Sequence, residues 1–322
     1  MLTPHTLNEF KEGSSKVMKS VGVVVLTLNA EKHLVRCLSP IMQSSLSPKI
    51  LVVDSSSKDQ TRSLAYSLGV EVLSIPQATF NHGKTRELAR KHLGTDLVVM
   101  LTPDAYAVNP QVLEKLIEPI LQGKASIAYA RQIPHEGADF FESFPRYYNY
   151  PVRSEIRSIA DRRRYGSYTF FCSDSCAAYL NSALDEIKGF HPVLLGEDTL
   201  ATAQLLKIGH KIAYVAEAEV RHSHRYSLRQ EFCRYFDTGL MRKKYENILN
   251  CAEGDQMRGN HYATCMLKQL YQEKPLLLPY ALMHIGAKWA GYRLGQASIN
   301  APLWWKKALS SQKYYWKKIT TS

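Results

Sequence analysis

Residues 21–28 read VGVVVLTL, an uninterrupted apolar run rich in β-branched side chains. Such a run is typical of a strand that is buried on both faces of a parallel sheet. Residues 31–44, EKHLVRCLSPIMQS, follow with the apolar spacing of a helix, and residues 49–54, KILVVD, form a second apolar run. The stretch therefore predicts a β-α-β unit, in which two parallel strands are joined by a helix.

The alternation of strand and helix continues through two further units. Apolar runs at 71–76 and 96–102 predict a third and a fourth strand. The helices before them are expected to end at Gly69 and Gly94, because a glycine after the last periodic residue is a common helix C-terminus. This order of elements predicts an α/β fold with a Rossmann-like, mostly parallel sheet and flanking helices.

The second half of the chain is less regular. Strands are expected within 170–180 and at 211–220, with a helix between them. Residues 125–167 are rich in Arg and Tyr and have no clear period, which predicts a long surface excursion, either a functional lid or a solvated basic helix. From residue 227 to the end the pattern is helical, basic and aromatic.

Composition and charge bound the class of protein. The chain has 322 residues, of which 45% are hydrophobic and 22% charged, and this excludes wholesale disorder. The formal net charge is +12, which favours an anionic partner such as a phosphorylated substrate, a nucleic acid or an anionic membrane surface. Residues 241–322 hold 13 Lys and Arg against 4 Asp and Glu. A basic C-terminal appendage on a nearly neutral body is therefore expected.

The predicted organisation has three parts: a flexible N-terminal arm at 1–20, a catalytic body at 21–226 and a helical region at 227–322. None of the six cysteines forms a CxxC pair, which favours free thiols in a reducing cytosol. The polar N-terminus predicts no secretory leader, and no apolar run approaches the roughly 20 residues of a membrane span. These features together predict a cytoplasmic protein.

Residues 303–318, LWWKKALSSQKYYWKK, mix Trp and Tyr with Lys. This composition is typical of an interfacial anchor, in which aromatic rings lie at headgroup level and ammonium groups meet anionic lipid. The alternative is a helical pair packed on the body, which could also form a homodimer. The membrane interpretation predicts a peripheral protein on the inner face of the cell membrane.

Polar side chains follow the predicted strands directly. Thr27 and Asn29 follow the first strand, Asp54 ends the second before three serines, and Asp104 follows the fourth. Because the carboxyl ends of parallel strands face one edge of an open α/β sheet, ligands are expected at that edge. The turn after the first strand has no glycine, and no Walker A sequence occurs, so a dinucleotide fingerprint and a P-loop are both excluded.

Three acids stand out, and the residues alone leave two explanations for each site. Asp104, in LTPDA, is either a ligand for a hard divalent cation or part of an Asx turn after Pro103. Glu197 and Asp198, in LGEDT, begin an expected helix, where acids complement the helix dipole and the free amides. A carboxylate at the same place could act as a general base.

Six motifs are informative together: VVVLTLNAEKHL (23–34), LVVDSSSKDQT (51–61), FNHGKTRELA (80–89), VVMLTPDA (98–105), GEDT (196–199) and HSHRYS (222–227). Their order and spacing over Val21 to Thr238 resemble an inverting glycosyltransferase of family 2, a family with the GT-A fold. Within it, FNHGKTRELA, TPDA and HSHRYS resemble the rhamnosyltransferase subgroup that uses dTDP-L-rhamnose. A C-terminal helical, basic extension would follow the GT-A body.

The resemblance implies that the strand-end residues bind the donor nucleotide. It also implies a divalent cation, Mg²⁺ or Mn²⁺, at Asp104. The family often has D-x-D there, and Thr102 stands in place of the first acid. The residues implied around the nucleoside are Thr27, Asn29, Glu31, Asp54 and Ser56, and those beside the diphosphate are Gly83 and Arg86.

Two histidines follow the last expected strand. His222 and His224 alternate along an extended chain and so share a face, from which they could reach the metal or the diphosphate. The alternative is that one packs in the interior and the other is solvated. Both belong to the predicted metal group with Asp104.

The resemblance implies Asp198 as the general base, with Glu197 as its neighbour. The base would take the proton of an acceptor hydroxyl that attacks the anomeric carbon opposite the diphosphate, so a single displacement inverts the configuration. Metal-assisted departure of the diphosphate completes the implied reaction. Asp174 is expected to touch acceptor or sugar, and the neighbouring Cys172 and Cys176 are expected to be buried apolar residues.

The implied partners are a nucleotide-sugar donor and a glycan acceptor, including lipid-linked glycans, in the synthesis of a bacterial surface polysaccharide. The same fold with a UDP- or GDP-sugar donor is the nearest alternative. A basic nucleic-acid-binding protein and an inactive GT-A scaffold are rivals of another class. Nucleic acid is not expected, because carboxylates that line the strand ends repel phosphate backbones.

Overall fold

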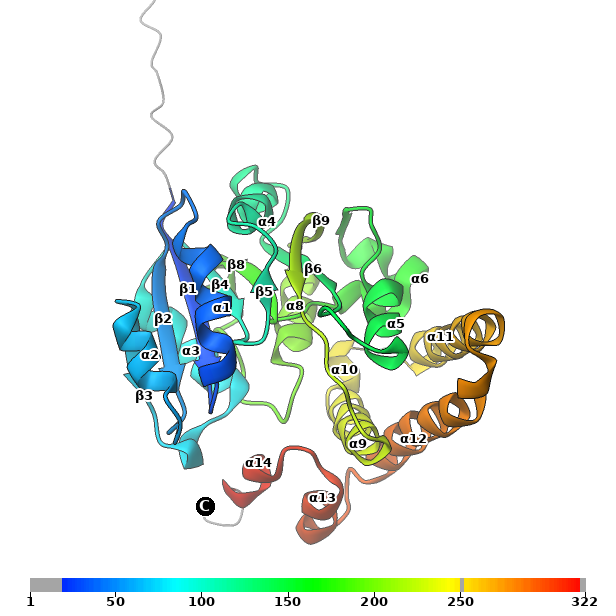
Figure 1. Cartoon of the computed structure of the whole chain (residues 1–322). Helices are drawn as coiled ribbons and strands as arrows, with labels where there is room; N and C mark the ends of the chain where they lie inside the picture. Colours follow the sequence, from blue (N-terminus) through cyan, green and yellow to red (C-terminus); the bar gives the residue numbers. More distant parts are fainter. Residues whose placement is uncertain (1–18, 250–251, 319–322) are drawn as a thin grey trace, which may run out of the picture.

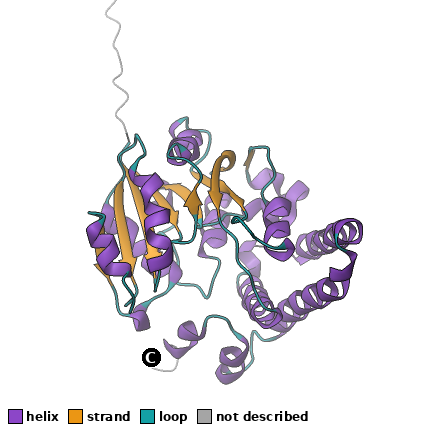
Figure 2. Cartoon of the chain, viewed as in Figure 1, coloured by secondary structure: helices purple, strands orange, loops and turns teal. Residues whose placement is uncertain are grey.

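The computed structural model describes residues 19–249 and 252–318 as a sheet covered by helices on both faces, with further helices beyond one end of the sheet (Figures 1 and 2). The sheet has the strand order β3-β2-β1-β4-β8-β6-β9-β5, and β7 pairs with β9. The predicted arm at 1–20 lies almost wholly outside the described residues. The strands are β1 Val21–Thr27, β2 Lys49–Asp54, β3 Glu71–Ser74, β4 Leu97–Leu101, β5 Tyr106–Ala107, β6 Ile127–Ile133, β7 Glu155–Arg157, β8 Cys176–Leu180 and β9 Ile212–Arg221.

The first four strands are parallel, as the sequence predicts. Thr27 pairs with Asp54 at the carboxyl ends of β1 and β2, so both residues reach the same edge. The sheet becomes mixed beyond β4, because β8 runs antiparallel to both β4 and β6, while β6 and β9 are parallel. The edge that carries Asp54 is thereby extended across the molecule toward the end of β9.

Helices α1 to α8 accompany this sheet. The glycines expected to end two of them do so with positive φ, 72° at Gly69 and 57° at Gly94, a conformation that costs glycine no Cβ clash. Separate apolar cores fill the two sides of the sheet, and every residue of β1 is buried. The helices are α1 Glu31–Met42, α2 Thr61–Ser67, α3 His82–Leu93, α4 Val112–Leu121, α5 Phe140–Asn149, α6 Arg162–Tyr165, α7 Asn181–Glu186 and α8 Glu197–Lys207.

The prediction of a surface excursion at 125–167 is wrong for its first part. Residues 127–133, IAYARQI, form β6 in the middle of the sheet, and Ile127, Ala128 and Tyr129 have no exposed surface. The run was missed because it is short and carries Arg131 and Gln132. Both polar side chains have partners inside the protein, Glu219 for the arginine and Ser173 for the glutamine.

The helical C-terminal region packs on the body. Three glycines let α9 and α12 approach closely, since a Cβ on Gly239, Gly291 or Gly295 would lie within about 2.3 Å of a backbone oxygen of the other helix. Within residues 19–249 and 252–318, no helix is long and apolar enough to cross a bilayer. The elements are α9 Leu228–Lys244, α10 Glu246–Leu249, α11 Ala252–Glu273, η4 Pro275–Leu277, α12 Leu278–Ala297, α13 Leu303–Leu309 and α14 Lys313–Lys318.

The segment at 303–318 is held against α9. Trp316 is buried with Leu194 and Leu240, and the backbone N–H and hydroxyl of Ser311 donate to the Asp237 carboxylate at 2.8 and 2.6 Å. Trp304 remains 69% exposed. The packing alternative for this segment is therefore realised for part of its aromatic side chains, and the membrane alternative stays a prediction.

Candidate active site

One cluster, the metal cluster, comprises Asp104, His222 and His224. Their ligand atoms lie within 4.8 Å of one another. Nε2 of His222 and Nε2 of His224 each lie 3.5 Å from a carboxylate oxygen of Asp104. Among the residues that the structure describes, no other group of three His, Cys, Asp or Glu side chains is close enough to hold an ion.

Local structure brings the three ligands of the metal cluster together. Asp104 sits in the turn between β4 and β5, which is closed by a bond from the N–H of Ala105 to the carbonyl of Thr102. His222 and His224 lie just past β9 and their rings meet edge to face, 4.5 Å between centroids. Thr102, at the position of the first acid in D-x-D, contributes no charge, and the two histidines are the candidate ligands beside Asp104.

Gln132 fixes which nitrogen of His222 faces the cluster. The amide oxygen of Gln132 lies 2.9 Å from Nδ1 of His222. Because an amide oxygen only accepts, Nδ1 carries the proton and Nε2 offers its lone pair toward Asp104. The guanidinium of Arg146 donates to the same amide oxygen at 2.8 Å, which holds Gln132 in this orientation. This arrangement is typical of an outer shell around a metal-binding imidazole.

The protonation states of the three side chains in the metal cluster favour binding of a cation. Burial of Asp104 favours its neutral form, but the neighbouring His222 and His224 outweigh this and hold the pKa of the carboxyl well below the usual value. Burial lowers the pKa of His222, and burial together with repulsion from His222 lowers the pKa of His224 to about 3. An ionised carboxylate beside two neutral imidazoles is a donor set that divalent transition metals accept.

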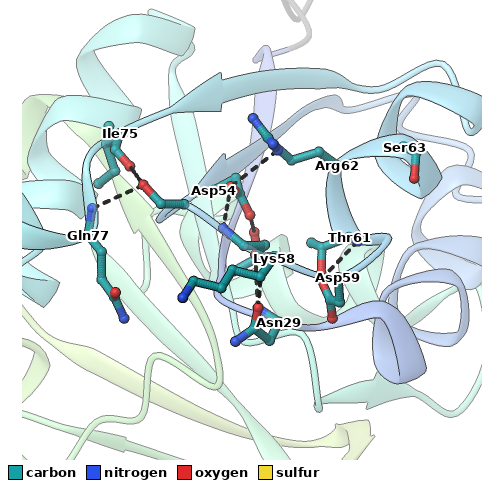
Figure 3. A network of polar contacts seen from close by, with 12 residues as sticks. Asn29, Asp54, Lys58, Asp59, Thr61, Arg62, Ser63, Ile75 and Gln77 are labelled. Carbon is teal, nitrogen blue, oxygen red and sulfur yellow. Dashed lines mark hydrogen bonds and ion pairs between the residues drawn. The ribbon is translucent and has the colours of Figure 1, made fainter.

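The predicted nucleoside residues lie together at the ends of β1 and β2, as Figure 3 shows for Asn29 and Asp54. Asn29 and Ser56 both adopt positive φ, and both are exposed. The carboxamide oxygen of Asn29 accepts from the backbone of Lys58 at 2.9 Å (Figure 3), and Ser56 donates to the carbonyl of Ile75 at 3.0 Å. These bonds fix a loop that presents polar groups to solvent.

Asp54, Thr27 and Glu31 differ from that exposed pair. The Asp54 carboxylate is fully buried and accepts from the backbone N–H of Ser57 at 3.0 Å, with the Thr27 hydroxyl at 3.3 Å. Glu31 is half-buried, and its carboxylate accepts from the N–H of Gln60 at 3.0 Å. Asp54 and Thr27 therefore shape the loop from below, and a direct contact of the Asp54 carboxylate with a nucleoside requires the loop to open.

A second cluster, the acid cluster, comprises Arg86, Asp174, Glu197 and Asp198. The Arg86 guanidinium lies 2.9 Å from Asp174 through Nε and also pairs with Glu197. These three side chains are 5%, 3% and 7% exposed. Asp198 is half-buried, and its two oxygens accept from the backbone N–H groups of Thr199 at 2.6 Å and Asp174 at 3.3 Å.

The two acids at the start of α8 thus differ in charge state and access. Burial opposes ionisation of Glu197, but Arg86 and then His82 hold its pKa below the usual value. Burial and the neighbouring charge of Glu197 raise the pKa of Asp198 to about 6. Asp198 also satisfies one free amide of the helix start, so capping and an accessible carboxylate coexist. Asp198 is the member of the pair that can exchange a proton near neutral pH.

Arg86, Gly83 and Asp174 take places that the sequence did not suggest. Arg86 is buried among carboxylates, and a Cβ on Gly83 would lie 1.9 Å from the carbonyl of His191 and 3.4 Å from Cβ of Glu197. The structure thus puts Arg86 in the acid cluster and Gly83 in its packing, and a contact of either residue with a diphosphate stays a prediction. Asp174 accepts from the Tyr179 hydroxyl at 2.6 Å and is closed to a sugar in this arrangement; burial raises its pKa to about 7.

Gln132 links the two clusters. Its amide nitrogen donates to the hydroxyl of Ser173 at 2.8 Å, and the backbone N–H of the next residue, Asp174, donates to Asp198.

Sequence analysis missed Gln132, Arg146, His82 and Tyr179, because their contacts join residues far apart in the chain. The sequence offered a signal for His82 alone among these four, because His82 stands next to Gly83 in the motif that begins FNHG. The predicted burial of Cys172 and Cys176 is confirmed, and both are unpaired.

Comparison with known proteins identifies the family. A model described as glycosyl transferase family 2 matches residues 22–188. The O-antigen chain rhamnosyltransferase RfbN of Salmonella typhimurium is 35% identical over 306 residues, covering 94% of this chain and 98% of that protein. The O-antigen chain rhamnosyltransferase WbaN of Salmonella anatum is 35% identical over 282 residues, covering 87% and 90%.

Solved structures agree on the fold. The mannosyltransferase PcManGT from Pyrobaculum calidifontis, solved with GDP-Man and Mn²⁺, aligns with a TM-score of 0.56 at 16% identity, over 95% of this chain and 87% of that one. Staphylococcus aureus TarS 1-349, solved with UDP, aligns with a TM-score of 0.53 at 16% identity, over 87% and 91%. Both are similar in fold alone at this identity. The predicted α/β architecture is confirmed as GT-A, and the chain belongs to glycosyl transferase family 2 as a glycosyltransferase.

Proposed function

We propose that the chain is an inverting rhamnosyltransferase that moves L-rhamnose from dTDP-L-rhamnose to a hydroxyl of a growing surface polysaccharide of the O-antigen type. The observation that carries this proposal is the 35% identity to RfbN, which extends over nearly the whole of both chains. A likeness of that extent includes the C-terminal helices as well as the common transferase body.

Asp198 serves as the general base in this proposal. Its pKa of about 6 leaves it ionised at neutral pH while keeping it basic enough to accept a proton from a hydroxyl in the transition state. Its mount on the first turn of α8 limits its movement. Glu197 is held by Arg86 and keeps a negative charge beside Asp198, which raises the affinity of the base for a proton.

Asp104, His222 and His224 hold the divalent cation. The donor set fits, because the lone pair on Nε2 of His222 faces the ionised carboxylate of Asp104. Two imidazoles with one carboxylate favour Mn²⁺ over Mg²⁺, which prefers oxygen ligands. A bound cation supplies charge stabilisation to the leaving diphosphate.

The nucleotide lies between the loop of Asn29 and Ser56 and the metal cluster. The exposed amide and hydroxyl groups of this loop suit a pyrimidine and its ribose, while Thr27, Asp54 and Glu31 keep the loop in shape. The opposite side of the metal cluster is left for the two sugars. The finer roles of Gly83 and Arg86 are positional here, since they hold the acid cluster.

The acceptor in this proposal is a lipid-linked glycan, and the protein works at the inner face of the cell membrane. The outward face of α12 supports this, because Leu282, Met283 and Trp289 are 59%, 54% and 64% exposed on it. Trp304 and the lysines of α13 lie nearby in the chain. Binding of the wild type to anionic vesicles, compared with binding of the double variant Trp289→Ser, Trp304→Ser, tests the membrane attachment. If both proteins are recovered equally in the unbound fraction, the attachment is rejected.

Calorimetric titration with dTDP, UDP, GDP and CDP, each with Mn²⁺, Mg²⁺ or neither, tests the donor. The expected result is metal-dependent binding that is tightest for dTDP and stronger with Mn²⁺. Tighter binding of UDP or GDP would keep the fold and the base but overturn the rhamnose donor. Transfer from dTDP-L-rhamnose to lipid-linked glycan isolated from a strain that lacks this enzyme is the matching activity assay.

A further inference from the structure

A cavity of about 330 Å³ opens beside the metal cluster. His224 belongs to both the metal cluster and the wall of this cavity. The remaining wall comes from the start of α5, the loop before α9, α9 itself, η4 and α12. Most of these elements lie beyond residue 188, where the match to the common family domain ends. The cavity is thus built mainly by the part of the chain that lies beyond the match to the family model.

Aromatic rings form much of the wall. Phe141 and Tyr280 meet edge to face at 4.8 Å, and Tyr226 lies 5.2 Å from His224. All three are half-buried, so part of each ring faces the space between them. Flat ring faces of this kind suit the C–H faces of a pyranose, which are apolar, while its hydroxyls need polar partners at the edge.

His284 provides a polar partner with unused capacity. The residue is 1% exposed and lines the cavity, and its Nε2 lies 3.2 Å from the ionised carboxylate of Glu231. Since that carboxylate accepts, Nε2 carries the proton and Nδ1 is left as an acceptor. Nδ1 is buried and has no hydrogen-bond partner in the protein. A buried acceptor without a donor is costly, and a ligand hydroxyl supplies the donor.

The charges around the cavity balance. Glu231 is paired with Lys288 at 3.6 Å, behind the wall, and Asp139 lies 3.6 Å from Arg225. Glu142 bonds to the backbone of Asp139, and Lys274 adds one positive charge. A phosphate would find no concentration of positive charge here, and a cation no concentration of negative charge. A neutral ligand is favoured by this balance.

We propose that this cavity, between Phe141, Tyr226, Tyr280 and His284, binds a neutral sugar ring of the acceptor glycan and so selects the acceptor. The proposal rests on the proposed function in that it takes the chain to be a glycan-extending transferase. The ring stacks on Tyr280 and Phe141 and donates a hydroxyl to Nδ1 of His284. The donor sugar stays at the metal cluster, so the two sugars occupy separate places.

Saturation-transfer NMR with methyl glycosides tests the site without turnover. The probes are methyl α-glycosides of glucose, galactose, mannose and L-rhamnose, each added to the full chain with and without saturating dTDP and Mn²⁺. At least one glycoside is expected to receive saturation from aromatic protons and to keep it when the nucleotide is bound. Displacement by the nucleotide, or no transfer to any glycoside, would overturn the proposal.

Matched variants locate the binding. Tyr280→Ala should weaken glycoside binding about tenfold by removing an aromatic face, and Tyr271→Ala, an exposed tyrosine on α11, should leave it unchanged. His284→Gln keeps a donor toward Glu231 and removes Nδ1, so it should also weaken binding while leaving the melting temperature near that of the wild type. Unchanged binding in both cavity variants rejects the site.

The same variants separate this inference from the proposed function. Nucleotide affinity and slow hydrolysis of the donor by water should be unaffected in Tyr280→Ala and His284→Gln, while KM for the lipid-linked acceptor rises about tenfold. A wild type that binds nucleotide and hydrolyses donor, with variants whose acceptor KM is unchanged, would sink the acceptor site alone. Failure of the wild type to bind any nucleotide would sink the proposed function, whatever the glycosides do.

Discussion

The metal cluster and the acid cluster lie near the same end of the sheet and treat charge in opposite ways. In the metal cluster, Asp104 is ionised beside two neutral imidazoles, and no arginine or lysine is paired with it among the described residues. In the acid cluster, Arg86 is buried between Asp174 and Glu197 and neutralises part of their charge. The metal cluster therefore has an ionised carboxylate that is free to bind an added cation. In the acid cluster, the carboxylates are already paired with the cationic side chain of Arg86.

This contrast explains why three carboxylates so close together serve different purposes. A buried ion pair is a weak source of stability but is costly to break, so Arg86 acts chiefly to keep Glu197 charged and to limit the rise in the pKa of Asp174 inside the protein. Asp198, left outside the pairing, keeps a raised pKa and partial access. The pairing of its neighbours with Arg86 leaves Asp198 as the carboxylate at the start of α8 that is available for the proposed role of base.

Asp104→Ala is expected to have the largest effect on activity. Without the carboxylate, the two imidazoles lose their charged partner, and kcat/KM should fall by about three to four orders of magnitude with loss of metal-dependent nucleotide binding. Calorimetry with dTDP and Mn²⁺ measures the binding. Glu136→Ala, which removes an exposed acid that faces Arg221, is the control and should bind as the wild type does. Metal-dependent binding that survives in Asp104→Ala would place the cation elsewhere.

Asp198→Asn should lower kcat by about 10²–10⁴-fold, the usual contribution of a general base, while nucleotide affinity stays the same. The raised pKa also predicts the sign of a stability change. A carboxyl whose folded pKa is raised is favoured below its unfolded pKa and loses that advantage as pH rises through about 6. The variant should therefore melt no lower than the wild type at pH 8. A large loss of melting temperature there would make Asp198 a structural residue.

Arg86→Leu should act on stability more than on chemistry. It leaves Glu197 and Asp174 buried without a partner, which costs roughly 3–5 kcal/mol. The control is Arg62→Leu, which removes a guanidinium that is 53% exposed and 3.9 Å from Asp54, and this should cost less than about 1 kcal/mol. Urea unfolding measures both. Equal and small losses in the free energy of unfolding of the two variants would mean that Arg86 is positioned to bind a ligand instead of to pair with the acids.

Gln132→Leu should have an intermediate effect that is largest at the metal cluster. Loss of the bond to Nδ1 frees the ring of His222 to rotate and change tautomer, and metal affinity should fall about 10–100-fold. Titration with Mn²⁺ at fixed dTDP measures the change, and Gln122→Leu, on the exposed end of α4, is the control. If the variant changes the pH dependence of kcat on the acidic side but not the metal affinity, Gln132 acts on the acid cluster instead.

The sequence predicts the first four strands because their signals are local. β1, β2 and β4 are apolar runs, and two of the helices beside them end at glycines with positive φ. β6 has no such local signal, because it contains polar residues whose partners lie far along the chain. Gln132, for example, contacts His222 and Ser173. A polar residue inside a central strand carries no local sign of the site that it supports.

The site residues divide in the same way. Asp104, His222 and His224 are recognisable because each follows a strand, and strand ends meet at one edge. The partner of Arg86 is not recognisable from its own motif, since Glu197 lies 111 residues away. The resemblance to a family suggested that Arg86 meets a diphosphate, and only packing of α3 against α8 turns the guanidinium to the acids. Residue type indicated the chemistry, and tertiary contacts decided which ligand each charge meets.

The smallest expected change concerns the pH at which the base ionises. In the wild type, kcat should rise with pH through an acidic limb near 6 and level off above it, because only ionised Asp198 accepts a proton. Tyr179 donates to Asp174 at 2.6 Å and stabilises its ionised form, and the ionised fraction of Asp174, whose pKa is about 7, repels the charge of Asp198.

Tyr179→Phe removes that donor, so Asp174 should hold its proton to higher pH and repel Asp198 less. The acidic limb should then move down by a few tenths of a pH unit, a shift worth about 0.5 kcal/mol. A full kcat–pH profile at saturating donor and acceptor measures it, with Tyr129→Phe as a control in which a buried hydroxyl is lost from the neighbourhood of Arg157. A limb that stays in place would mean that Asp174 is already neutral at that pH and that its repulsion contributes nothing to the base.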